Sequence, residues 1–151
     1  MISSRYVRET SLSTSPRFSE RDMVNCIASH LRDAGYKIRA QVPNMGQIAD
    51  LVVQRNRWLT AIEAKRHDWR RALAQCRAHE SVADFICVAI GTQSISHPLL
   101  QEVEATGYGL IHFRPGDRTC NWVIKPKFNR KIWRPQRQRF LQVLRSIHDV
   151  V

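Results

Sequence analysis

Long apolar runs and closely spaced cysteines are both missing from this 151-residue sequence. No stretch approaches the roughly 18 apolar residues of a membrane-spanning helix, which excludes such a helix. The first 18 residues also lack the apolar core of a secretion signal. No C-x-x-C pair is present, which disfavours a zinc site and favours free thiols in a reducing, cytoplasmic setting. The four cysteines are Cys26, Cys76, Cys87 and Cys120.

Three signatures of common enzyme classes are missing as well, and acidic residues are scarce. The sequence has no G-x-S-x-G elbow, no G-x-x-x-x-G-K-[ST] phosphate loop and no G-x-G-x-x-G dinucleotide fingerprint. Its 13 Asp and Glu residues face 24 Lys and Arg residues, which gives a net charge of +11. Such a charge favours a polyanionic partner, nucleic acid ahead of an anionic membrane surface.

The positive charge is concentrated in the last quarter of the chain. Residues 1–113 carry 14 basic and 11 acidic residues, whereas residues 114–151 carry 10 basic and 2 acidic residues. The length suits one domain, since single domains commonly run about 100–200 residues. We therefore expect a flexible arm over residues 1–17, a core domain over residues 18–113, and a basic extension over residues 114–151 that packs on the same domain.

Helix and strand patterns alternate along the core domain. Ser19 can cap a helix over residues 19–34, in which Met23, Ile27 and Leu31 recur every four positions. The alternation predicts a three-layer α/β/α fold with a central mixed sheet. The other predicted elements are strands over residues 36–42, 47–54, 58–64, 84–90, 108–113 and 121–125, a turn over 43–46, and helices over 67–82, 98–105 and 136–148.

Two acidic residues stand inside apolar strand patterns. Asp50 lies in I-A-D-L-V-V and Glu63 in A-I-E-A-K, although acids are depleted in strands and unfavourable to bury unpaired. A hairpin between these strands would bring Asp50 beside Glu63, and Lys65 would share a face with Glu63. Two adjacent carboxylates need a positive group between them. Lys65 can be that positive group, but a divalent cation such as Mg²⁺ or Mn²⁺ is better suited. Its coordination sphere keeps open positions for water and phosphate.

This arrangement favours metal-assisted hydrolysis of a phosphodiester bond. The metal would lower the pKa of a bound water, and Lys65 would orient that water or stabilise the developing negative charge. The alternative is that Asp50 and Glu63 are ordinary residues of a half-solvated sheet, with Glu63 paired to Lys65 or Arg66.

The pattern of Asp50, twelve intervening residues, Glu63, Ala64 and Lys65 resembles the PD-(D/E)XK nuclease superfamily, the restriction-endonuclease-like fold. The similarity extends over roughly residues 19–113, because the order of helices and strands agrees as well. It implies a Mg²⁺- or Mn²⁺-dependent DNA endonuclease in which Asp50 and Glu63 bind the metal and Lys65 assists the attacking water. Small members of the superfamily often act as homodimers, so the resemblance also implies a possible homodimer for this chain.

The resemblance implies two further site residues. Glu20 matches an acid that many members place on the first helix, where it joins the metal ligands, and Gln75 matches a Gln that some place on the helix after the E-x-K strand. Two positions depart from the pattern: Ala49 replaces the nominal Pro, and His79 stands where one branch has Tyr four residues after the Gln.

The segment from Lys125 to Arg139 holds seven basic residues and no acid, interrupted by Phe128 and Trp133. Basic residues contact phosphates, and aromatic rings stack on bases; alternatively, the two rings anchor the segment to the core. A non-catalytic nucleic-acid-binding module and a protein- or RNA-binding adaptor remain alternatives to a nuclease. The residues predicted to contact DNA are Arg66, Arg70, Lys125, Lys127, Arg130, Lys131, Trp133, Arg134 and Arg137.

Overall fold

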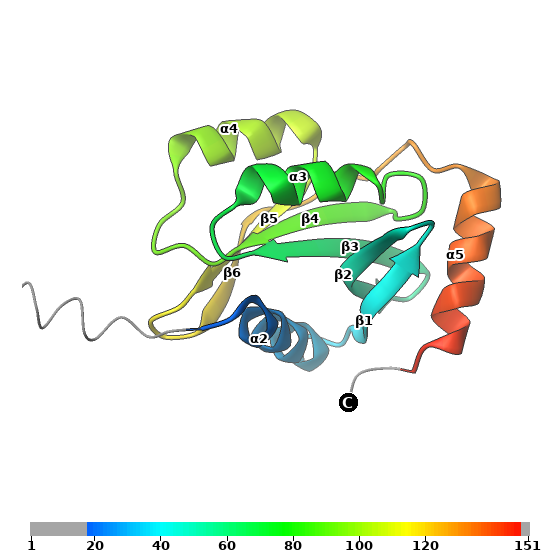
Figure 1. Cartoon of the computed structure of the whole chain (residues 1–151), viewed down its shortest axis with the longest axis horizontal. Helices are drawn as coiled ribbons and strands as arrows, with labels where there is room; N and C mark the ends of the chain where they lie inside the picture. Colours follow the sequence, from blue (N-terminus) through cyan, green and yellow to red (C-terminus); the bar gives the residue numbers. More distant parts are fainter. Residues whose placement is uncertain (1–17, 149–151) are drawn as a thin grey trace, which may run out of the picture.

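The computed structural model describes residues 18–148, and the predicted arm over residues 1–17 lies outside the described residues. Six strands form one mixed sheet in the order β1-β2-β3-β4-β5-β6. Helix α2 covers one face, α3 and α4 cover the other, and α5 stands at one end (Figure 1). The predicted α/β fold is thus confirmed. The elements are α2 (Glu20–Asp33), β1 (Lys37–Asn44), β2 (Gln47–Arg55), β3 (Trp58–Lys65), α3 (Trp69–Arg77), β4 (Phe85–Ile90), α4 (His97–Thr106), β5 (Gly109–Arg114), β6 (Thr119–Ile124) and α5 (Arg134–Ser146).

The three central strands are the parallel part of the sheet. β3 pairs with β4 and β4 with β5 in parallel, while the β1–β2, β2–β3 and β5–β6 pairs are antiparallel. β3 and β4 are buried almost throughout because helices cover both of their faces. No helix among residues 18–148 is both long and apolar enough to cross a bilayer.

Helix α2 forms where its sequence pattern predicts it. The Ser19 hydroxyl accepts a hydrogen bond from the Asp22 N–H, and the Asp22 carboxylate accepts one from the Ser19 N–H, which makes a capping box. Met23, Ile27 and Leu31 are buried against the sheet. The helix start therefore has a fixed position, and with it the first-turn residue Glu20.

The first strand is longer than predicted, and the turn after it is shorter. Pairing continues through Pro43 with Ile48 and Asn44 with Gln47, so the predicted turn over residues 43–46 narrows to Met45 and Gly46. Both turn residues have positive φ, 47° and 84°. Pro43 is tolerated because β1 is an edge strand of the sheet.

The helix predicted over residues 67–82 is the shorter α3. Asp68 caps its start by accepting from the Arg71 N–H, and it ends at Arg77. Beyond it, the Val82 N–H bonds to the His79 carbonyl, and the Ala78 carbonyl accepts from the Asn44 side chain. A side chain from β1 thus replaces the backbone donor that a continued helix would supply.

The basic extension belongs to the same sheet and core. Its β6 pairs with β5, and Phe140 and Leu144 of α5 pack with Val42 and Val52 of the β1–β2 hairpin. Helix α5 begins two residues before the predicted helix, and its packing closes one end of the sheet.

Arg137 joins α5 to the start of β4. Its guanidinium lies 3.1 Å from the Asp84 carboxylate and donates to the Val82 carbonyl at 2.8 Å, and the Asp84 side chain is 5% exposed. The same carboxylate accepts from the Leu59 N–H at 2.8 Å. The sequence places Arg137 among the DNA-contacting residues, and in the structure its side chain, 20% exposed, is paired with Asp84.

We expect the Arg137→Ala substitution to lower the free energy of unfolding by about 3 kcal/mol, because it leaves a buried carboxylate without its cation. Urea denaturation measures this loss. Arg139→Ala is the matched control, since Arg139 is exposed on the same helix and its loss should change stability by about 0.5 kcal/mol or less. Equal stabilities of the two variants would contradict the structural role of Arg137.

Candidate functional site

The candidate site forms where β2 separates from β3. Their pairing runs from Arg55 with Trp58 to Leu51 with Ile62 and stops there. In the next position the Asp50 carboxylate accepts the Ala64 N–H at 2.8 Å, in place of a backbone carbonyl. On the other side of Asp50, Gln41 of β1 has a φ of 53°. Asp50 therefore lies between an irregular residue of β1 and the point where β2 and β3 stop pairing.

Glu63 lies against Asp50 inside the protein. Its side chain is 2% exposed. Burial raises the pKa of Glu63, and the adjacent Asp50 carboxylate raises it further, while a hydrogen bond from His79 opposes both effects. The predicted proximity of the two acids is therefore present in the structure, with Glu63 far more deeply buried than Asp50.

A chain of buried polar groups leads away from Glu63. His79 Nε2 lies 2.6 Å from Glu63 Oε1, and His79 Nδ1 lies 3.1 Å from the amide nitrogen of Asn44. That amide nitrogen also donates to the Ala78 carbonyl at 3.0 Å, which fixes its orientation. His79 Nδ1 is therefore an acceptor, so the ring proton sits on Nε2 and is donated to Glu63. Gln136 of α5 continues the chain by donating to the Asn44 oxygen at 3.3 Å.

Lys65 and Glu20 meet at the end of β3. The Lys65 ammonium lies 3.7 Å from Glu20 Oε2, with the lysine side chain 15% exposed. Glu20, Asp50 and Ala64 line one cleft of about 630 Å³, which the side of α2 closes. Four of the predicted site residues, Asp50, Glu63, Lys65 and Glu20, are thus gathered at one end of β3.

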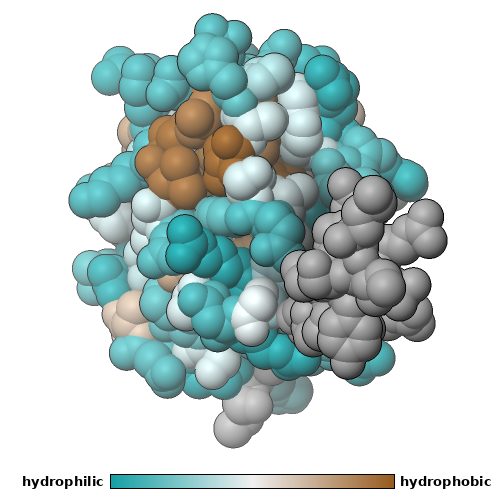
Figure 2. Space-filling model, turned by 90° about the vertical axis from the view of Figure 1, so that its left-hand side faces the viewer, coloured by the Kyte–Doolittle hydropathy of each residue, from teal (hydrophilic) through white to brown (hydrophobic). Residues whose placement is uncertain are grey.

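This end of the sheet has a largely polar surface. β3 and β4 end at the left of Figure 1, and Figure 2 views the molecule from that side. Its described surface is mostly hydrophilic, with an apolar patch at the height of α3 and α4. Such a surface suits a charged ligand better than an apolar one.

Asp50 and Glu63 fit a hard divalent cation. Each carboxylate has one oxygen committed to a protein donor, Asp50 to the Ala64 N–H and Glu63 to His79, which leaves a second oxygen on each. Mg²⁺ is commonly held by one or two carboxylates, with waters and substrate phosphate completing its octahedron. Among residues 18–148 no group of three His, Cys, Asp or Glu residues is arranged as a metal site, so Glu20 does not complete a preformed three-acid set.

Gln75 carries an unsatisfied polar atom. Its side-chain oxygen is buried and has no hydrogen-bond partner among the described residues. Because buried acceptors are nearly always paired, this oxygen is a ready acceptor for water or a ligand group. Gln75 lies on α3, next to Cys76, whose pKa is raised by burial and by the charge of Glu63.

The residues predicted to contact DNA fall at two ends of the sheet. Arg66 and Arg70 follow β3 and lie over the rings of Phe18 and Trp69, at 5.3 and 4.1 Å. The segment from Lys125 to Arg139, called the tail below, lies at the other end of the sheet, where the Asn129 N–H donates to the Asp84 carbonyl. In that tail Lys131 pairs with Glu80 at 3.1 Å, and Arg137 is held by Asp84. The predicted contacts of this segment that are exposed are Lys125, Lys127, Arg130, Lys131, Trp133 and Arg134.

His79, Asn44 and Gln136 are site neighbours that the sequence pattern does not reveal. Asn44 fits the pattern of a turn, and Gln136 fits a solvated helix start. The one sequence signal is at His79, which follows Gln75 by one helical turn and replaces the Tyr of a related pattern. The structure shows that this His donates to the second acid of the motif.

Comparison with known proteins supports the fold. No family model matches the chain, and no curated protein matches it. A protein of unknown function from Silicibacter pomeroyi is similar in structure, with a TM-score of 0.66 and 16% identity over 86% of each chain. An XisH family protein from Nostoc punctiforme gives a TM-score of 0.51 at 12% identity, over 66% of this chain and 97% of that one. An fdxN element excision controlling factor from Anabaena variabilis gives 0.52 at 12% identity, over 69% and 97%. At these identities the likeness concerns the fold.

Proposed function

We propose that this protein is a metal-dependent DNA endonuclease that hydrolyses phosphodiester bonds. The observation that supports it most is the contact between Asp50 and Glu63 at the opening between β2 and β3, with Lys65 at the end of the same strand. Two acids forced together without a cation between them are unfavourable in the free protein. A binding site for a divalent cation is the chemistry that such an arrangement serves.

Each residue has a distinct task in this proposal. Asp50 and Glu63 would hold Mg²⁺ or Mn²⁺, which when bound supplies a water of lowered pKa and offsets charge on the phosphate. The Lys65 ammonium orients the attacking water or donates to a phosphate oxygen, and Glu20 holds that ammonium at the end of β3. The N–H of His79 fixes the rotamer of Glu63, so that its second oxygen keeps one direction.

A non-catalytic DNA-binding module is the second candidate. The deep burial of Glu63 and its hydrogen bond to His79 favour this alternative, because both restrict the access of a hydrated cation. The name of the similar fdxN element excision controlling factor is compatible with either function. Cleavage by the purified protein distinguishes the two functions.

The decisive experiment is a cleavage assay with Mg²⁺ or Mn²⁺ on duplex, single-stranded, flapped and four-way DNA. We expect at least one of these substrates to be cut and EDTA to stop the reaction. Cutting of RNA in preference to DNA would revise the substrate class. If the protein binds these DNAs but cuts none of them with either metal, the endonuclease proposal fails and the binding module stands.

DNA affinity is expected to fall steeply with salt. Three phosphate contacts from the exposed tail residues would weaken binding about 40-fold between roughly 50 and 200 mM salt. The tail holds enough free cations for this number in Lys125, Lys127, Arg130 and Arg134. Fluorescence anisotropy with a labelled duplex measures the slope. A constant affinity over that range would remove the tail from the DNA interface.

A further inference from the structure

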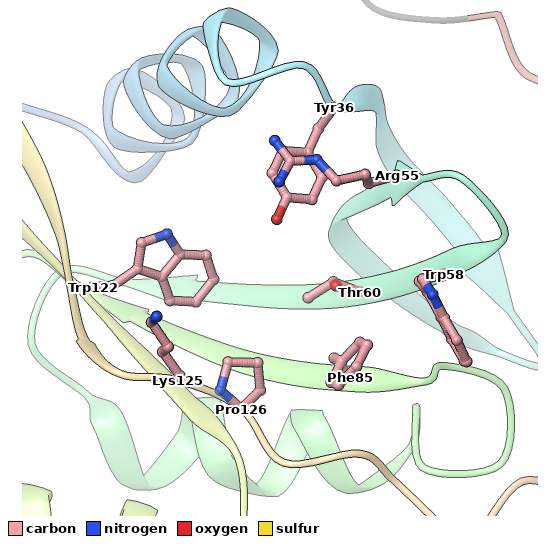
Figure 3. Close-up of a pocket in the computed structure, with 8 residues that line it drawn as sticks. All are labelled: Tyr36, Arg55, Trp58, Thr60, Phe85, Trp122, Lys125 and Pro126. Carbon is pink, nitrogen blue, oxygen red and sulfur yellow. The ribbon is translucent and has the colours of Figure 1, made fainter.

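A second hollow lies at the end of β3 away from the acidic site. It encloses about 360 Å³, near the low end of the roughly 300–1,000 Å³ typical of small-molecule sites (Figure 3). Thr60 at the start of β3 and Phe85 at the start of β4 belong to its lining and pair in register. Thr60 also pairs with Val53, which belongs to the core under α2. The hollow therefore opens on the α2 face of the sheet.

Aromatic rings form much of the wall. In Figure 3 Trp122 and Trp58 stand at opposite sides of the hollow, with Tyr36 above the strands. Trp58 is 37% exposed and Trp122 is 38% exposed. Trp58 packs edge-on against Phe85 and Phe128, with ring centroids 6.2 and 5.6 Å apart, so its position is fixed. Rings that are held in place yet open to solvent are stacking surfaces for another planar group.

The charged groups of the lining are cations. The Arg55 guanidinium lies 4.2 Å from the centroid of the Tyr36 ring and donates to the Ala34 carbonyl, which holds it at the rim. Lys125 reaches the hollow from the end of β6, and Arg57 lies over the Trp58 ring at 4.6 Å. Among residues 18–148 no acidic side chain lines the hollow. The chemistry is thus planar apolar surface surrounded by positive charge.

We propose that this hollow, defined by Tyr36, Trp58, Trp122, Arg55 and Lys125, binds an unpaired nucleotide of a single-stranded DNA segment. A base would stack on the indole rings, and its phosphates would contact Arg55 and Lys125, the combination by which proteins hold single strands. The inference rests on the DNA partner of the proposed function but requires no catalysis. A second copy of this chain, also at +11, would be repelled from the same cations.

The two sites lie along the same two elements. Trp58 and Lys65 are seven residues apart on β3, which at roughly 3.3 Å per residue separates them by about 23 Å. Helix α2 has 14 residues and is about 21 Å long, with Glu20 in its first turn and Tyr36 just beyond its end. This distance equals about seven nucleotides along one strand of B-form DNA. A substrate with an unpaired segment at that separation from the cut would engage both sites.

Anisotropy titrations in EDTA test this binding without cleavage. The probes are a labelled oligothymidylate of about ten nucleotides and a blunt duplex of the same length. Trp122→Leu removes the ring but keeps apolar bulk, and Lys125→Ala removes one cation. Val123→Ala is the matched control, because Val123 is exposed on the same strand and does not line the hollow.

We expect Trp122→Leu to weaken binding of the oligothymidylate about tenfold, and binding of the duplex less than about twofold. Trp122→Phe should retain wild-type affinity within about threefold, and Lys125→Ala should reduce the slope of log affinity against log salt by about 0.7 for the single strand. Urea midpoints of the variants verify that each is folded. Three results would overturn the proposal: equal losses of affinity for the single strand and the duplex, wild-type affinity in both Trp122→Leu and Lys125→Ala, or no binding of the single strand by wild-type protein. Single-strand binding with these losses, in a protein that cuts no substrate, would uphold it while the endonuclease proposal fails.

Discussion

The Asp50→Asn variant is expected to lose DNA cleavage by about 10³-fold or more while it keeps the wild-type fold. The amide oxygen can still accept the Ala64 N–H that Asp50 accepts now, so the opening between β2 and β3 keeps its backbone partner. What is lost is one of the two negative charges that would hold the metal. A bound metal contributes several kcal/mol to transition-state stabilisation, and each 1.36 kcal/mol corresponds to a factor of ten in rate.

The same substitution should raise the stability of the metal-free protein. In the wild type the Asp50 charge opposes ionisation of Glu63, and Asn removes that repulsion. Added Mg²⁺ should therefore raise the melting temperature of the wild type and leave that of Asp50→Asn unchanged, because only the wild type has the full pair of ligands. Differential scanning fluorimetry with and without Mg²⁺ measures both effects.

Asp33→Asn serves as the matched control for both measurements. Asp33 is exposed at the end of α2, away from the cleft that Glu20 and Asp50 line, so its variant should cut DNA like the wild type and respond to Mg²⁺. A wild-type cleavage rate in Asp50→Asn would exclude Asp50 from catalysis. An unchanged melting temperature of wild-type protein in Mg²⁺ would exclude the metal site.

The fold could be predicted because its signals are local. The cap at Ser19, the four-residue spacing of Met23, Ile27 and Leu31, and the continuous apolar run of β4 each identify an element from its own residues. Errors arose at element ends that a distant residue controls. The end of α3 is one example, since its stop depends on Asn44, a side chain from another strand.

The candidate site could be predicted only in part for the same reason. The proximity of Asp50 and Glu63 is predictable, because two apolar strands joined in a hairpin bring these positions opposite each other. The contacts of Glu63 with His79, and of His79 with Asn44, join residues 16 and 35 positions apart, and no periodicity links such positions. The number of basic residues in the tail can likewise be counted from the sequence. The ion pair of Arg137 with Asp84 cannot, because it depends on the fold.

The polar chain connects the candidate site to the basic extension. Glu63, His79, Asn44 and Gln136 run from β3 through the end of α3 and the tip of β1 to α5. The extension is therefore in contact with the acidic site through protein groups, although its exposed cations lie at the other end of the sheet. A change at His79 should affect both the stability of the core and the position of Glu63.

Replacing His79 by Leu should lower the free energy of unfolding by about 3 kcal/mol, because it leaves the buried carboxylate of Glu63 without a donor. Replacing both partners, as Glu63→Met with His79→Leu, removes the polar pair together and should lower stability much less than the sum of the two single changes. The double-mutant cycle in urea should therefore show a coupling energy of about 2 kcal/mol.

His79→Gln separates the positioning role of this side chain from its packing. The amide can donate to Glu63, so this variant should regain part of the stability that His79→Leu loses and part of the cleavage rate. Leu100→Ala offers a comparison in the same protein, since Leu100 is half-buried on α4 and distant in the chain from Glu63. It should lower stability without changing the cleavage rate at temperatures where the variant is folded. If His79→Leu and Glu63→Met lower stability additively, the two side chains are not coupled, and His79 does not position the second acid of the site.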